Sequence, residues 1–290
     1  MAGLDWKVLQ LPVSVNITPG YQVSSRNHVA NVRDTDHRVL GVVSKRYAPV
    51  QNDEAFKFVD ILLDHGDVRL ETAGSLHGGQ IVWLLARLKR ADRVCGDELA
   101  TYLLFANGHN GQFSVKVLIT PVRVVCANTL NLALKGSTRT WTTTHVGDIK
   151  GRVEDARYTL GLAHDYMDLL VKAAKELLSI RVSDDQLRTV VNTLIPMPDN
   201  AGPTRRRNVS ILRGDLLTRR FAPDLRGMES TGWAVVNAVA DHVAHVPRLR
   251  AEAEHDPGKT EAASESRFYS IVTGHAMLDK AYTMVTHLGV

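Results

Sequence analysis

The chain has 290 residues, of which 44% are hydrophobic and 23% charged, and this globular composition excludes a disordered, collagen-like or purely coiled-coil chain. No apolar run reaches the ~20 residues that span a bilayer, so we expect no membrane partner. The net charge is only +4, but arginine outnumbers lysine, a bias that suits phosphate recognition and is also typical of GC-rich genomes.

Short apolar runs separated by Gly, Asn and Asp dominate the first 150 residues. Alternating apolar and polar residues are typical of β-strands, and Asn52 can cap a helix with an apolar stripe. Predicted strands cover residues 38–48, 68–75, 80–90, 100–106 and 113–120, and predicted helices cover 52–65 and 126–135. We expect one mostly antiparallel sheet of about five strands with helices packed against it.

The spacing of apolar residues becomes helical after residue 150. From Val153 to Leu177 they recur at intervals of three and four, which predicts a heptad-like helix over 152–178. This seam indicates a helix on its own core or, less simply, a subunit contact. Further helices are predicted at 184–195, 231–246 and 262–288, with a turn at 255–258. The sequence thus predicts an α+β protein with a β-rich domain over 1–150 and a helical region over 151–290.

Signatures of the common enzyme classes are missing from the sequence. It contains no GxxxxGK[ST], GxGxxG, HExxH or GxSxG motif, so we expect no cofactor and no catalytic residues. Asp241, His242 and His245 are close together on a predicted helix, but their spacing and the lack of a further ligand favour a structural role over a metal site. Two cysteines, Cys95 and Cys126, are too few for a disulfide framework, and we expect a reduced, cytoplasmic protein.

The positive features of the sequence are clusters of basic residues. Some lie where predicted strands end, beside aromatic residues, and such a surface can follow a nucleic-acid backbone while bases stack on the rings. Another, at 205–226, carries seven arginines against two aspartates. These arginines indicate a polyanionic or acidic partner, or else ion pairs within the chain. The candidate DNA-binding residues are Lys45, Arg46, Tyr47, Arg87, Lys89, Arg90, Lys116, Arg123, Lys135, Arg139, Trp141, Arg205, Arg206 and Arg207.

Within this set, we expect some residues to line a DNA-binding groove and others to stack on bases. We expect four basic residues to line the groove: Arg87, Lys89, Lys116 and Arg123. Tyr47 or Trp141 is expected to stack on bases, and the 205–226 segment is a second DNA contact or a partner site.

Several short blocks of the sequence occur in a specific order. They are Tyr47–Asn52, Glu54–Phe56, Glu71–Leu76, Gly78–Gly79, Trp83–Leu88, Thr120–Leu130, Thr231–Ala234 and Glu265–Phe268. Together they resemble the phage/plasmid-like protein family, a bacterial and phage domain of unknown function, over about residues 38 to 285. This family name implies no activity.

The order of predicted elements resembles, more weakly, the β-β-β-α core of Rad-type single-strand annealing proteins. That resemblance implies an oligomer, a ring or a filament, that binds single-stranded DNA in a basic groove without nucleotide or metal. We therefore expect an ATP-independent annealing protein of a phage or mobile element that acts in homologous recombination and DNA repair. The alternatives are a DNA-metabolism or defence enzyme with a His/Asp site, and a structural oligomer with no nucleic-acid role.

Overall fold

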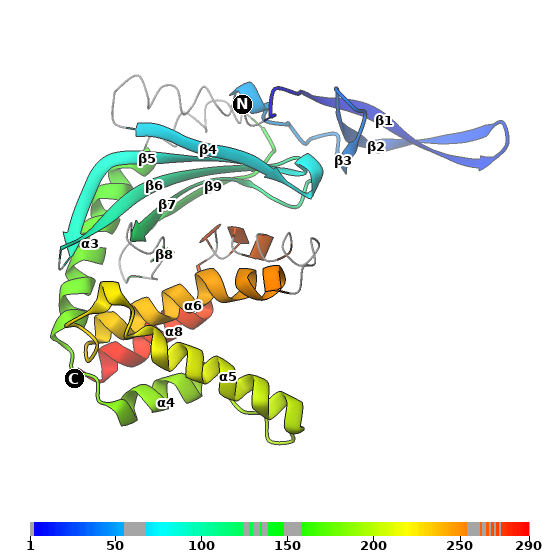
Figure 1. Cartoon of the computed structure of the whole chain (residues 1–290). Coiled ribbons are helices and arrows are strands. Elements are labelled where there is room, and N and C mark those ends of the chain that lie inside the picture. Colours follow the sequence, from blue (N-terminus) through cyan, green and yellow to red (C-terminus); the bar gives the residue numbers. More distant parts are fainter. Residues whose placement is uncertain are drawn as a thin grey trace. The chain divides into compact units, whose positions relative to one another are not determined.

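The computed structural model of the chain describes residues 3–54, 68–94, 96–123, 128–129, 134, 139–147, 158–253, 262, 265–266, 268–269, 271–272 and 274–289. The chain forms two compact units. The first comprises Met1–Arg90, Thr101–Ile119 and Thr138–His164, and the second comprises Ala91–Ala100, Thr120–Ser137 and Asp165–Val290. Strands and a helical C-terminal region are both present (Figure 1), which confirms the α+β class. The predicted boundary at residue 150, the turn at 255–258 and both cysteines lie outside the described residues.

A three-stranded antiparallel sheet is built from the first strands of the chain. Its order is β1 (Val8–Thr18), β2 (Tyr21–Arg33) and β3 (Val39–Ser44). The predicted elements do not include the β1–β2 hairpin, although apolar residues alternate along β1. One face of this sheet packs into a core that joins Leu4, Trp6, Val8, Leu40 and Val82.

A second sheet holds the remaining strands, in the order β4-β5-β6-β7-β8, with β9 paired to β7. Its strands are β4 (Val68–Leu76), β5 (Ile81–Val94), β6 (Asp97–Gly108), β7 (Val115–Arg123), β8 (Asn128–Thr129) and β9 (Thr140–Thr143). The strands predicted at 68–75, 80–90, 100–106 and 113–120 are therefore confirmed. The strand predicted at 38–48 belongs to the other sheet as β3, because the β1–β2 hairpin pairs with it.

Helices make up most of the second unit. They are α3 (Tyr158–Ser179), α4 (Asp184–Leu194), α5 (Pro203–Arg219), α6 (Gly232–Ala253) and α8 (Ala276–His287), with short 3-10 turns at His77–Gly79 and Pro223–Leu225. The predicted seam of α3 is buried at Met167, Leu170, Ala174 and Leu177. A Cβ on Gly232 would lie 3.0 Å from the Leu177 carbonyl oxygen and 2.5 Å from Val285, so the seam packs within the chain's own core. No helix among the described residues is long and apolar enough to cross a membrane.

Two helix predictions are wrong within the described residues. The helix predicted at 126–135 is a strand at Asn128–Thr129, because these residues pair with Arg123 and Val122 of β7. The single helix predicted at 262–288 is interrupted at Gly274, whose φ of 82° does not continue a helix. His275 then caps α8, since its side chain accepts a hydrogen bond from the Met277 N–H. The helix predicted at 52–65 is described only at residues 52–54, where it is helical.

Candidate nucleic-acid interface

A cavity of about 540 Å³ lies in the first unit. Its walls come from the end of β3 and from the loops at 110–114 and 144–146. Gly41 of β3 lets this strand and the 110–114 loop approach each other closely. A Cβ on Gly41 would lie 2.6 Å from the Cα of Asn110, so only glycine permits this contact without a backbone shift. The lining residues, none of them Asp, Glu, Lys or Arg, are His28, Val42, Val43, Ser44, Tyr47, Asn110, Gly111, Gln112, Phe113, Ser114, Thr144, His145 and Val146.

Two stacked rings form one wall of this cavity. The rings of Tyr47 and His145 lie 4.5 Å apart with an angle of 19° between their planes. The Tyr47 hydroxyl donates a hydrogen bond to the Gly108 carbonyl, and His145 Nδ1 donates to the Ala48 carbonyl at 3.3 Å. Burial raises the pKa of Tyr47 and lowers the pKa of His145. Both rings are therefore uncharged and fixed in place.

A buried histidine beside the cavity is held by an amide. The Asn52 side chain donates hydrogen bonds to the Leu4 and Trp6 carbonyls at 3.1 and 3.3 Å, so its oxygen faces His109 Nε2 at 3.2 Å as an acceptor. His109 therefore carries its proton on Nε2. Burial lowers the pKa of His109 to about 3. This network keeps the segment that leads into the Asn110 loop neutral and rigid.

Three cations surround the neutral cavity. Lys45 and Arg46 are exposed in the turn between Ser44 and Tyr47, both of which line it. Lys116 Nζ lies 5.8 Å from the centre of the Phe113 ring, another lining residue. In the part of the chain that the structure describes, these three side chains form no ion pair. The arrangement therefore combines an aromatic and hydrogen-bonding floor with unneutralised positive charge.

The two aromatic residues predicted to stack on bases are not placed for it as expected. Tyr47 is only 8% exposed and its ring already stacks on His145, so we assign it a positioning role. Trp141 is half-buried and pairs with Val117, whereas Lys116 pairs with Thr142. Because successive residues of a strand point to opposite faces, Trp141 and Lys116 lie on opposite faces of the sheet. The aromatic residue beside Lys116 is Phe113, which is not one of the predicted DNA-binding residues.

The other strand residues do not gather at the cavity. Arg87 is half-buried on β5, opposite Arg69 of β4, and Lys89 is exposed two residues further on. β6 separates this strand from the strand of Lys116. Arg139 is half-buried and donates to the Ile119 carbonyl at 3.4 Å. The side chains of Arg90, Lys135 and Arg123 lie outside the described residues.

The second candidate region is α5, which carries most of the 205–226 segment. Pro203 begins the helix at a position where proline is favourable, and only Val209 and Leu216 are buried. Of the arginines near its C-terminal end, Arg213 donates to the Ile195 carbonyl at 2.8 Å. Arg220 donates to Asp184 at 2.6 Å and its guanidinium lies 4.5 Å from the Phe221 ring centre.

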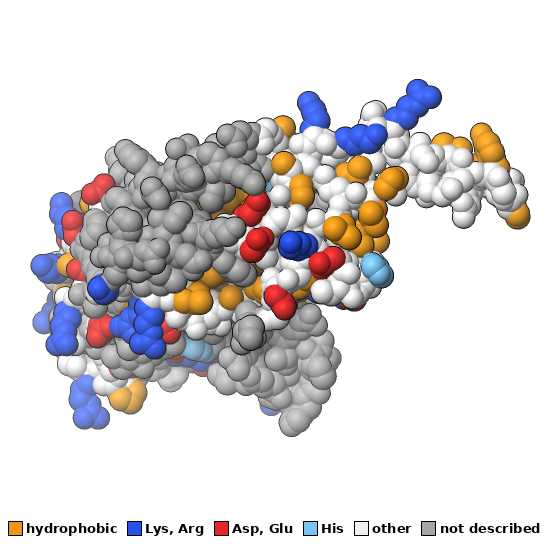
Figure 2. Space-filling view, turned by 90° about the horizontal axis from the view of Figure 1, so that it is seen from above, with side chains coloured by type: hydrophobic (Ala, Val, Ile, Leu, Met, Phe, Trp, Pro, Cys, Tyr) orange, Lys and Arg blue, Asp and Glu red, His pale blue; other side chains and the backbone are white. Residues whose placement is uncertain are grey.

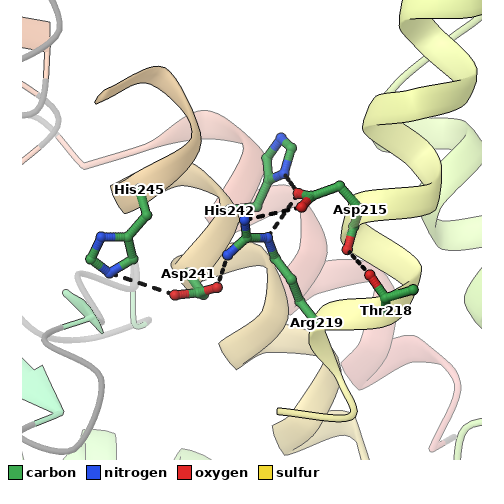
Figure 3. Close-up of polar contacts among 6 residues, drawn as sticks. All are labelled: Asp215, Thr218, Arg219, Asp241, His242 and His245. Atoms are coloured by element: carbon green, nitrogen blue, oxygen red, sulfur yellow. Dashed lines mark hydrogen bonds and ion pairs between the residues drawn. The ribbon is translucent and has the colours of Figure 1, made fainter. Parts of the chain in front are cut away.

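Arg219 is the most heavily paired of these arginines (Figure 3). It donates to both carboxylate oxygens of Asp215, at 2.8 and 3.1 Å, and also to Asp241 of α6. His242 Nδ1 lies 2.9 Å from Asp215, and His245 Nε2 lies 3.5 Å from Asp241. Burial opposes ionisation of Asp215, but the hydrogen bonds from Arg219 and His242 outweigh it and lower the pKa of this carboxyl. The histidine and aspartate cluster therefore joins α5 to α6 through an arginine.

The first two turns of α5 differ from its C-terminal end. Arg205, Arg206 and Arg207 are all exposed, and the first turn contains no acidic residue. Arg206 donates to the Ala201 carbonyl at 2.8 Å. Within the described ranges, none of these three arginines forms an ion pair. The N-terminal end of a helix dipole is positive, so it repels these arginines, which also repel one another. The combined positive charge attracts anions.

The comparison with protein families places the chain in one of them. The model of a domain of unknown function, DUF932, matches residues 39–264, and the chain belongs to this family. The predicted membership of an uncharacterised family is thus confirmed, and the family description carries no activity. No curated protein and no solved structure matches the chain.

Proposed function

We propose that this protein binds single-stranded DNA without covalent chemistry and promotes the annealing of complementary strands. The observation that carries the proposal is the cavity near β3, which has no charged lining residue and is bordered by Lys45, Arg46 and Lys116. Its volume lies within the usual range of small-molecule pockets, roughly 300–1,000 Å³, so it can take one or two bases.

The chemistry of the cavity suits a nucleotide unit. The Phe113 ring offers a stacking surface, and the Asn110 and Gln112 amides offer donors and acceptors to base edges. The three bordering cations can neutralise the phosphates on either side of a bound base. Release of counterions from those phosphates would supply much of the affinity.

The exposed arginines of α5 give the second contact in this proposal. A guanidinium binds phosphate oxygens in a bidentate manner, and three successive arginines can follow a flexible backbone. The two surfaces lie in different units of the chain, so each is proposed on its own residues. A strand held by its phosphates keeps base edges available to a complementary strand, which is the requirement for annealing.

The remaining parts of the proposal rest on resemblance. The blocks that resemble the phage/plasmid-like family support a role in a phage or mobile element, and the Rad-type order of elements supports an oligomer that acts in the cytoplasm in recombination and repair. The absence of a phosphate-loop motif from the sequence supports annealing without ATP.

Fluorescence anisotropy with a labelled single-stranded oligonucleotide tests the proposal. Affinity should fall linearly on a log–log plot against salt, and the steepness should drop by about 0.7 for each phosphate contact removed. Lys45→Ala/Arg46→Ala should therefore reduce the slope by about 1.4, and Arg205→Ala/Arg206→Ala/Arg207→Ala by about 2.

The control removes two lysines that face solvent on α3, Lys172→Ala/Lys175→Ala, which should leave the slope nearly unchanged. Failure of the wild type to bind at low salt would refute the proposal. Cleavage of the oligonucleotide would favour the enzyme alternative instead. Acceleration of strand annealing without nucleotide or metal would support the annealing step.

A further inference from the structure

The β1–β2 hairpin exposes an unusual number of apolar side chains (Figure 2). Between 41% and 60% of each of the following is exposed, on the hairpin and on the neighbouring β3: Leu9, Leu11, Val15, Ile17, Tyr21, Val23, Val39 and Val42. An isolated hairpin with solvent on both sides is at best marginally stable. Such a surface therefore suggests a partner.

Residues two apart on a strand share a face, which groups Leu9, Leu11, Val15 and Ile17 on β1 and groups Tyr21 with Val23 on β2. Val15 lies opposite Val23, and two three-residue rows cross the sheet at its base, Leu9–Val32–Val39 and Leu11–Ala30–Val42. The other face of the hairpin is polar, because Ser14 pairs with Ser24 and Asn16 with Gln22. We call the first surface the apolar face, defined by the eight exposed residues above.

The size of the apolar face matches a protein interface. With typical side-chain areas, its exposed surface is on the order of 700 Å², above the roughly 300–600 Å² of the largest patch on most monomers. A stable interface of standard size buries about 800 Å² on each partner. One apolar face is therefore large enough to hold one partner chain.

The lack of charge on most of the hairpin limits which class of partner can bind the apolar face. Residues 8–25 contain no charged side chain, in a chain with 35 basic and 31 acidic residues. This surface cannot neutralise phosphates, so nucleic acid is a poor match. A bilayer is a poor match too, because the edge of β1 would leave backbone groups without partners in hydrocarbon. The surface that complements an uncharged, apolar sheet face is another uncharged, apolar sheet face.

We propose that the apolar face packs against the same face of a second copy of this chain. Two such faces make an isologous contact, with the sheets about 10 Å apart, as in a β-sandwich. Packing through the face is favoured over pairing through the edge of β1. Pro12 lacks an N–H there, and the register shifts after Pro12 and after Asn16 interrupt a regular edge. This inference deepens the proposed oligomer. The apolar face shares only Val42 with the lining of the proposed DNA-binding cavity, and the variants below lie elsewhere on the hairpin.

A pair of double variants tests the contact. Val15→Lys/Val23→Glu places opposite charges at a cross-strand pair on the apolar face, so the hairpin keeps a stabilising pair and the net charge is unchanged. The matched control, Asn16→Lys/Gln22→Glu, places the same charges at the neighbouring pair on the polar face. Sedimentation velocity over a range of protein concentrations measures the mass of each.

We expect the wild type and the control to self-associate, and Val15→Lys/Val23→Glu to raise the dissociation constant by roughly tenfold or more, since charge would be buried in an apolar contact. An apolar-face variant that keeps the wild-type mass would overturn the proposal, as would a wild type that stays monomeric at tens of micromolar. Binding of a monomeric wild type to phosphatidylcholine vesicles would assign the face to lipid instead. Oligonucleotide binding, measured on the same samples, reports on the proposed function separately.

Discussion

Two neighbouring helices of the second unit begin in opposite ways. α4 begins with a capping box, in which the Gln186 N–H donates to Ser183 Oγ at 3.2 Å and the Ser183 N–H donates to Gln186 Oε1 at 2.9 Å. Asp184 and Asp185 follow in its first turn. α5 begins at Gly202, which offers no side-chain cap, and three arginines follow in place of acids.

The difference shows what each helix end is suited to do. The start of α4 gives the Gln186 N–H an acceptor and has two acids that complement the helix dipole, which favours stability. The start of α5 does neither, and its exposed arginines oppose the dipole. A departure from the local rules of helix stability is expected at functional sites, where other contacts compensate for it. Here Arg219 and Arg220 compensate, because they tie the C-terminal end of α5 to α6 and α4.

The largest effect is expected where α5 is anchored. Arg219→Ala removes the cation between Asp215 and Asp241 and should lower the free energy of unfolding by about 2 kcal/mol, because two half-buried carboxylates lose their arginine partner. Urea denaturation measures this change. Arg207→Ala, at the exposed end of the same helix, should stay within about 0.5 kcal/mol of the wild type. Equal losses for the two variants would contradict the account.

A smaller effect is expected at the start of α4. Ser183→Ala removes the side-chain acceptor of the capping box and should cost about 1 kcal/mol. The change is measured by thermal or urea unfolding. A cost near zero would mean that water replaces the hydroxyl at no loss. The difference between the two helix ends would then not contribute to the free energy of unfolding.

The converse change at α5 should stabilise the protein slightly. Gly202 has φ −69° and ψ 169°, which any residue adopts, and a Cβ there would meet nothing within 4 Å. Gly202→Ser should therefore raise the free energy of unfolding by a few tenths of a kcal/mol, since serine caps slightly better than glycine. Calorimetry of the two proteins should show a small increase in Tm, whereas a decrease would show that this end of the helix is constrained by something else.

Acid should weaken the anchored end of α5. The lowered pKa of Asp215 means that its ionised form stabilises the fold at neutral pH, and that this contribution is lost as pH falls below the usual value of 3.8. The difference in unfolding free energy between the wild type and Asp215→Asn should therefore shrink below pH 4. A difference that stays constant down to acid pH would show that the Asp215 charge contributes nothing.

Much of the fold follows from local patterns in the sequence. Alternation predicts the strands that became β4 and β7, and continuous apolar runs predict β5 and β6. The three-four spacing predicts the buried seam of α3 at Met167 and Leu170. β8 could not be predicted in this way, because the apolar spacing of its segment also fits a helix and its pairing with β7 decides the outcome. The break at Gly274 depends on a positive φ that the sequence alone does not fix.

The candidate site is less accessible to sequence reasoning. Its cavity joins β3 to loops near Asn110 and His145, and no local pattern links segments so far apart. The sequence partly predicts that Arg205 and Arg207 are exposed, because no acidic residue lies near them in the sequence. No sequence pattern predicts the pairing of Arg219 with Asp241, since it depends on how α5 packs against α6.

Unfolding of Arg205→Glu/Arg206→Glu, with and without a single-stranded oligonucleotide, tests the central claim most directly. Without the oligonucleotide, acids at the start of α5 complement the dipole, and the free energy of unfolding should rise by about 0.5–1 kcal/mol. With it, the wild type should gain stability through binding, and the variant should gain clearly less. Two results would contradict the assignment of these arginines to phosphate binding. One is a variant that is less stable than the wild type when no oligonucleotide is present. The other is a variant that gains as much stability as the wild type when the oligonucleotide is added.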